Sequence, residues 1–140
     1  MALLFQASNL LVLPFWVLMI FAPRWGATRR IITSSAIIVP IALLYSVLVV
    51  PNLLSILPQL ANPTLPIIQT LLSSDAGATT AWIHFLAFDL WAGRWVYLDA
   101  QERGIPVWLV SICLGGVFMA GPFGLLVYLV IRWGMQRRQR

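Results

Sequence analysis

The chain has 140 residues, of which 61% are hydrophobic and 9% charged, and its mean hydropathy is +0.91. Ordinary soluble domains are about 45–50% apolar and about 25% charged, and a chain this short cannot bury so much apolar surface in a soluble fold. The composition therefore excludes a soluble globular enzyme and predicts the lipid bilayer as the main partner of the chain.

The charged residues indicate where apolar segments end. All nine basic residues are arginines, and with four acidic residues they give a net charge of +5. Seven of them form two clusters beside apolar runs: Arg24, Arg29 and Arg30, and then Arg132, Arg137, Arg138 and Arg140. Such clusters are typical of helix ends at a membrane surface. No basic face is left for a phosphate backbone, so we expect no nucleic-acid partner.

Four segments reach the length of about 20 apolar residues that a membrane-spanning helix needs. They are residues 3–22, 31–50, 78–98 and 105–131. The sequence therefore predicts an all-α fold, an integral membrane bundle of four transmembrane helices that forms a single transmembrane domain over residues 1–140.

The stretch 52–74, between the second and third spans, contains Pro58, Pro63 and Pro66. Each interior proline costs a helix about 3 kcal/mol, so we expect a Pro-rich interfacial or re-entrant segment there. Four spans would place the two arginine clusters on opposite sides of the membrane. A fifth crossing by residues 52–74 would place them on one side, so the orientation stays open.

The third span carries His84, Asp89 and Arg94. Ionisable groups inside a span cost several kcal/mol unless they are paired or hydrated, which makes these three the first candidates for function. Asp89 and Arg94 lie about 140° apart around an ideal helix, so we expect their partners on other helices. The candidate partners are Gln6, Ser8, Asn9, Tyr45, Ser46 and Tyr128. The pair either holds helices together or takes part in chemistry, and both interpretations stay open.

Aromatic residues accompany these groups. Helical spacing places Phe88, Trp91 and Trp95 on the face of His84, and Trp82 on the face of Asp89 and Gly93. Flat apolar walls of this kind suit a polyene or a tetrapyrrole, although lipid-facing aromatic residues give the same pattern. Trp25, Trp108 and Trp133 are instead typical of an interfacial aromatic belt.

Three further patterns predict helix packing, a helix kink and an ion pair. The small residues Gly116, Ala120 and Gly124 favour close approach of helices or of a flat ligand, and Pro122 predicts a kink. Asp99 and Arg103, four residues apart, predict a surface ion pair of little energetic worth.

Several kinds of catalytic site are excluded. One histidine and one cysteine exclude a zinc site of Cys/His ligands and a multi-histidine di-iron site. The sequence also lacks a phosphate-binding glycine loop and a nucleophile elbow. We therefore predict no metal site and no required cofactor.

The motifs that carry a family resemblance are the run 82–99, Ser8-Asn9, Pro14-Phe15-Trp16 and the run 121–126. Together they resemble the abscisic-acid-deficient-4-type family, small four-helix membrane proteins of plastids and cyanobacteria that are linked in plants to neoxanthin formation from violaxanthin. The resemblance implies a carotenoid-related membrane protein in the thylakoid or plasma membrane of a photosynthetic organism.

The resemblance also implies roles for individual residues. The plant role suggests an isomerase that opens a 5,6-epoxide to an allenic alcohol without a redox metal. Asp89 would then donate or accept a proton, and Arg94 or His84 would polarise the epoxide oxygen. Asn9, Trp82, Phe88, Trp91 and Trp95 would bind the carotenoid.

Two other interpretations remain. The chain is alternatively a small pigment-binding or structural accessory subunit of a photosystem or another photosynthetic membrane complex. Bound carotenoid or chlorophyll would then be its ligand, with His84 or Asn9 as an axial magnesium ligand. A transporter or channel is the third class, but the sequence shows no inverted repeat.

Overall fold

A computed structural model of the chain describes residues 1–138, so the predicted position of Arg140 at a helix end lies outside the described residues. Within residues 1–138 the regular structure is helical and no strand occurs, which confirms the all-α prediction. The helices are α1 (Ala2–Phe21), α2 (Gly26–Thr33), η1 (Ser35–Ile38), α3 (Val39–Val49), η2 (Val50–Asn52), α4 (Leu53–Ala61), α5 (Leu65–Leu72), α6 (Asp75–Glu102) and α7 (Val107–Arg138).

Three helical stretches are long and apolar enough to cross a membrane: Ala2–Phe21, Ser35–Ala61 and Val107–Arg137. Three of the four predicted spans thus correspond to helices with the required length and apolar character, and the bundle of four transmembrane helices, with α6 among them, stays a prediction. The second stretch begins at Ser35 rather than at Ile31, because Ser34 adopts an extended backbone (φ −71°, ψ 126°) that ends α2. It also continues through η2 into α4, beyond the predicted end at Val50.

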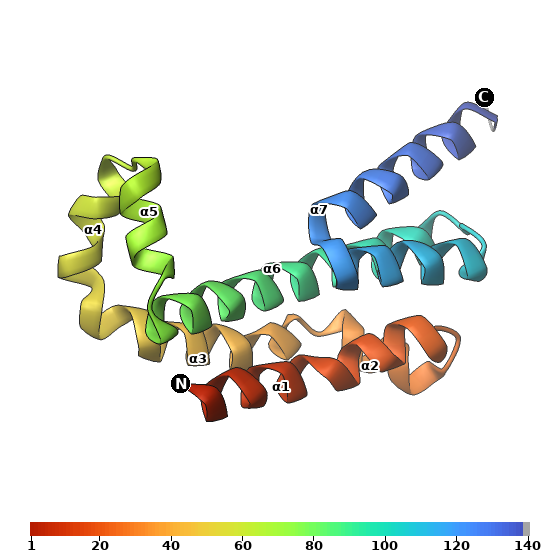
Figure 1. Ribbon diagram of the computed structural model, residues 1–140. Helices are drawn as coiled ribbons and strands as arrows, with labels where there is room; N and C mark the ends of the chain where they lie inside the picture. Colours follow the sequence, from red (N-terminus) through yellow and green to blue (C-terminus); the bar gives the residue numbers. More distant parts are fainter. Residues whose placement is uncertain (139–140) are drawn as a thin grey trace.

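The Pro-rich segment folds into the two short helices α4 and α5. Pro66 lies in the first turn of α5, where no helical hydrogen bond is lost, and Pro58 lies inside α4. Neither helix has a buried residue, and both lie at one end of the molecule, where α5 contacts the beginning of α6 (Figure 1). Whether this segment lies at the interface or re-enters the membrane remains a prediction.

Helix α6 is the central element, packed against α1, α3, α5 and α7. The closest approach to α1 is at Gly93, where an added Cβ would lie 2.5 Å from Cη2 of Trp16. The Trp16 ring also contacts Phe118 of α7, with ring centroids 5.3 Å apart. The missing side chain of Gly93 therefore makes room for an indole that joins three helices.

Helix α7 is broken in its middle. Ala120 (φ −150°, ψ 39°) and Gly121 (φ 20°, ψ −89°) are non-helical and precede Pro122, which confirms the predicted kink. After the break the outer arm of α7, residues 122–138, turns back from the inner arm, residues 107–119 (Figure 1). A Cβ on Gly116 would lie 3.1 Å from Cα of Gly124. The small residues thus bring two parts of one helix together, rather than two separate helices.

The reversal of α7 brings Arg132 to the end of the molecule that also holds Arg24, so members of both arginine clusters lie at one end. In the outer arm, Arg132 pairs with Asp99 near the end of α6. Two residues earlier on α6, the hydroxyl of Tyr97 donates a hydrogen bond of 2.9 Å to the carbonyl of Pro23, next to Arg24. The expectation that four continuous spans place the clusters on opposite sides is therefore wrong, because α7 does not run straight.

Candidate functional site

Asp89 lies on α6 beside the break in α7. It is half-buried, and a Cβ built on Gly121 would overlap its Oδ1 atom. Within residues 1–138, no hydrogen bond or ion pair joins the Asp89 carboxylate to another residue. Asp89 is therefore a half-buried carboxyl group in the middle of a mostly apolar helix, with Oδ1 packed against Gly121 and with no hydrogen-bond partner among residues 1–138.

Arg94 has a different environment. Its Nε donates a hydrogen bond of 2.8 Å to the carbonyl of Ile32, and its Nη2 donates one of 2.5 Å to the carbonyl of Thr33. These carbonyls belong to the last turn of α2 and have no partner within that helix. The arginine therefore caps the negative end of the α2 dipole.

His84 lies with a third set of neighbours. Its ring contacts Phe88, with centroids 4.7 Å apart, and Tyr45 of α3, with centroids 5.4 Å apart. Tyr45 was predicted as a partner of Asp89 or Arg94, and it contacts His84 instead. Asp89, Arg94 and His84 thus contact three different helices, α7, α2 and α3 respectively, and do not form one cluster.

Asn9 of α1 was predicted as a partner of Asp89 or Arg94, but it binds Trp82 of α6 instead. The indole Nε1 donates a hydrogen bond of 2.9 Å to Oδ1 of Asn9, and Nδ2 of Asn9 donates one of 2.9 Å to the carbonyl of Phe5. The Phe5 ring also packs against Trp82, with centroids 5.5 Å apart. Both polar atoms of the Asn9 amide are therefore engaged within the protein.

The predicted aromatic face of α6 divides into two parts. Phe88 and Trp91 are more than half exposed, which leaves them open to lipid or to a ligand. Trp95 instead packs edge-on against Tyr128, with centroids 5.8 Å apart, and lies beneath the guanidinium of Arg132. Phe88 and Trp91 can therefore line a binding surface as they stand, whereas Trp95 would first have to leave its contacts with Tyr128 and Arg132.

The Asp99 cluster, defined as Asp99, Arg103, Tyr128 and Arg132, was not predicted. Arg103 Nε lies 2.9 Å from both carboxylate oxygens of Asp99, and Arg132 Nε lies 2.9 Å from Oδ2. The Tyr128 hydroxyl donates a hydrogen bond of 2.5 Å to the same Oδ2. The Asp99–Arg103 pair exists, but the prediction that it lies on the surface is wrong, because Asp99 is only 9% exposed.

The acidity of Asp99 follows from these contacts. Burial raises the pKa of the carboxyl, but hydrogen bonds from Tyr128 and Arg103 and the charges of both arginines outweigh it and hold that pKa below its usual value. One sequence signal could have found each half of the cluster, although not the meeting of the two halves. Asp99 and Arg103, and likewise Tyr128 and Arg132, are four residues apart and so share a helix face.

Comparison with known proteins gives a family match. A family model described as ABA DEFICIENT 4-like matches residues 3–128. A similar curated protein is "Protein ABA DEFICIENT 4, chloroplastic" of Arabidopsis thaliana, 34% identical over an alignment of 117 residues that covers 79% of this chain and 53% of the relative. The chain thus spans about half the length of that relative. No solved structure matches it.

Proposed function

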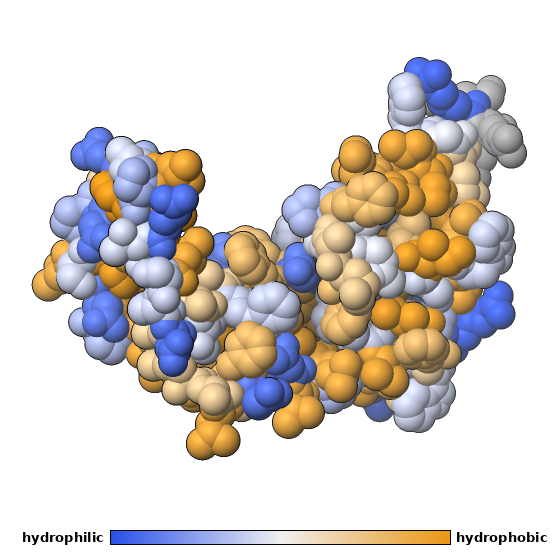
Figure 2. Space-filling view, in the orientation of Figure 1, coloured by the Kyte–Doolittle hydropathy of each residue, from blue (hydrophilic) through white to orange (hydrophobic). Residues whose placement is uncertain are grey.

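Because the chain belongs to the ABA DEFICIENT 4-like family, we propose that it is an integral membrane protein that acts on or binds a carotenoid. Three helices with the length and apolar character of membrane spans support the membrane location, and hydrophobic side chains cover much of the face in Figure 2. The proposed location is the thylakoid or plasma membrane of a photosynthetic organism.

The proposed reaction is the isomerisation of a 5,6-epoxycarotenoid to an allenic alcohol. One C–O bond of the epoxide breaks, a proton leaves the neighbouring polyene carbon, and a proton joins the oxygen. Substrate and product have the same atoms, so the step needs a group that moves protons rather than electrons. A carboxyl group in an apolar site is suited to that task.

The observation that carries the assignment is the free carboxylate of Asp89. Three ionisable residues were predicted within the third span. Arg94 donates its hydrogen bonds to carbonyls of α2, and the His84 ring packs against Tyr45 and Phe88. Of the three, Asp89 alone lies against the irregular backbone at Gly121, and its carboxylate has no hydrogen-bond partner among residues 1–138. We therefore assign the proton transfer to Asp89 and a structural role to Arg94, while His84 stays a candidate for polarising the epoxide oxygen.

The test is the pair of variants Asp89→Asn and Asp75→Asn, purified in mild detergent and supplied with an epoxycarotenoid such as violaxanthin. Loss of general acid–base catalysis typically costs about 10²–10⁴-fold in rate, so Asp89→Asn should convert pigment at least ~100-fold more slowly and bind it unchanged. Asp75 lies at the N-terminus of the same helix. The Asp75→Asn variant is therefore the matched control and should convert the pigment at the normal rate. Equal rates for the two variants would remove Asp89 from the mechanism.

The second candidate, an accessory subunit that binds pigment, is favoured by the exposed aromatic side chains of α6. Phe85, Phe88 and Trp91 are 57%, 62% and 55% exposed, and the surface is hollowed between α4–α5 and the outer arm of α7 (Figure 2). His84 is then the better magnesium ligand, since the Asn9 amide is already engaged. Stoichiometric co-purification with a photosystem, without turnover by the isolated protein, would favour this role.

A further inference from the structure

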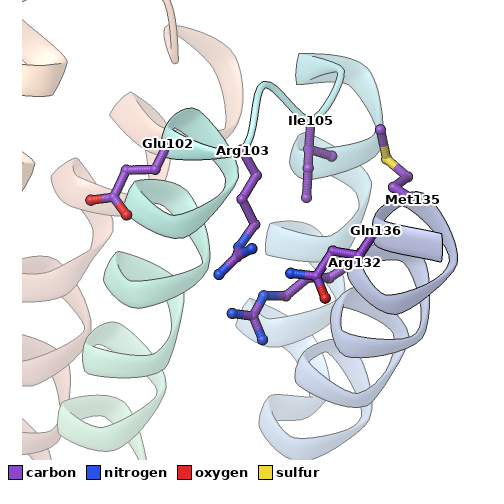
Figure 3. A pocket seen from close by; sticks show the side chains of 6 residues that line it. All are labelled: Glu102, Arg103, Ile105, Arg132, Met135 and Gln136. Atoms are coloured by element: carbon purple, nitrogen blue, oxygen red, sulfur yellow. The ribbon is translucent and has the colours of Figure 1, made fainter. Parts of the chain in front are cut away.

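The ends of α6 and α7 enclose a cavity of about 290 Å³ that the carotenoid chemistry does not use. Its lining residues are Glu102, Arg103, Ile105, Arg132, Met135 and Gln136. Figure 3 shows the guanidinium groups of Arg103 and Arg132 directed toward the same space, whereas the Glu102 carboxylate points away from them. The cavity therefore presents two cations on one side.

Asp99 fixes these two cations without neutralising both. Its single carboxylate accepts hydrogen bonds from Nε of Arg103 and from Nη2 of Arg132, and it also pairs with Nε of Arg132. The Tyr128 hydroxyl holds the same carboxylate in place. The terminal nitrogens of Arg103 have no acceptor among the described residues. Several oriented N–H groups of Arg103 thus remain for an anion on the side of the cavity away from Glu102, and contacts with Asp99 hold both arginine side chains before it binds.

Phosphate fits this arrangement better than a carboxylate. Guanidinium groups bind phosphate oxygens in a two-pronged manner, and two of them can bind three or four oxygens from one side. A cavity of this size also holds more than a single small anion, and Ile105 and Met135 give it an apolar wall.

The position of the cavity points to a lipid. It lies near the end of α6 that contacts Pro23, next to Arg24, and the neighbouring Trp108 and Trp133 are largely exposed, as is typical of residues at a membrane interface. Basic pockets between helix ends bind anionic lipid headgroups. We propose that this cavity binds the phosphate group of an anionic lipid headgroup, an interaction that does not depend on the carotenoid reaction.

The experiment measures thermal unfolding of the full chain in detergent micelles with added phosphatidylglycerol, with added phosphatidylcholine, or with inorganic phosphate. Phosphatidylglycerol should raise Tm and phosphatidylcholine should not. Arg103→Gln should weaken phosphatidylglycerol binding at least roughly tenfold, because charge-assisted hydrogen bonds are lost. Arg137→Gln is the matched control, since Arg137 stacks on Trp133 outside the cavity, and should respond like the unaltered chain.

A second variant guards against a general loss of stability in Arg103→Gln. Gln136 is exposed, so Gln136→Glu should fold normally while placing a negative charge in the cavity, and it should also lose the response to phosphatidylglycerol. If Arg103→Gln and Gln136→Glu respond like Arg137→Gln, the cavity is not a lipid site. An equal Tm increase with inorganic phosphate alone would show an anion site without lipid specificity and would overturn the lipid assignment.

Discussion

The carboxylate of Asp89 lies against Gly121, the residue at which α7 reverses its direction. The backbone of Gly121 has a positive φ of 20°, and a side chain there would occupy the position of the Asp89 oxygen. The candidate catalytic group and the break in α7 therefore depend on one another. Any change that straightens α7 also changes the surroundings of Asp89.

Gly121→Ala should destabilise the protein by about 1–3 kcal/mol, because it combines a disfavoured backbone conformation with an overlap at Asp89. Unfolding in detergent measures the loss, and Gly134→Ala is the control, since a Cβ on Gly134 meets nothing within 4 Å. In a double-mutant cycle, Asp89→Ala should recover the part of the loss that the overlap causes. No recovery would mean that backbone conformation alone is responsible.

Arg94→Gln should destabilise the protein by about 1–3 kcal/mol, since two carbonyls of α2 lose a charged donor. Arg94→Lys should cost less, because it keeps the charge near the end of the helix. The measurement is Tm together with pigment conversion per folded molecule, which we expect to be unchanged. A stable Arg94→Gln protein with no conversion would instead place Arg94 in the chemistry.

The Asp99 cluster should make stability depend on pH in the acid range. Because the folded-state pKa of Asp99 is below its usual value, the unfolded chain takes up this proton first as the pH falls. The stabilisation is complete above the ordinary carboxyl pKa of about 3.9 and is lost as the pH falls through the lower folded-state value. Unfolding measured between neutral pH and about pH 3 should show a steeper loss for the native chain than for Asp99→Asn, and equal slopes would contradict this.

Cysteine accessibility tests the reversal of α7. In a Cys113→Ala background, single cysteines at Gly26, Glu102 and Gln136, which are all exposed, should be labelled from one side of a sealed vesicle. A cysteine at Asn62 should be labelled from the other side. A continuous α7 would separate position 136 from position 26. A membrane crossing by residues 52–74 would separate position 102 from position 26, so each alternative topology gives its own pattern.

The sequence predicted those features that depend on local patterns. Composition indicated helices, Pro122 indicated a kink, and helical spacing showed that Asp89 and Arg94 could not pair along α6. Each of these follows from residue type and spacing within one helix. The predicted side-chain partners of Asp89 and Arg94 were wrong, because Asn9 binds Trp82 and Arg94 binds backbone carbonyls of α2.

The remaining features depend on the path of the chain in space. Proline marks where a helix bends, but the extent of the reversal depends on the close contact of Gly116 with Gly124. The meeting of Tyr128 and Arg132 with Asp99 follows from that reversal and has no local signature. The acceptors of Arg94 are backbone carbonyls, which every residue has, so no side-chain pattern could have identified them.

The gathering of arginines at one end has a consequence for insertion. Residues 31–93, which include α3, α4, α5 and most of α6, contain no lysine or arginine. Each positive charge carried across a membrane works against a potential worth about 2.3 kcal/mol per 100 mV. If the chain spans a membrane as proposed, the end of the molecule farthest from Asp99 can cross it without moving a basic side chain of residues 31–93, and we expect the arginine-rich end to stay on the side where the protein is made.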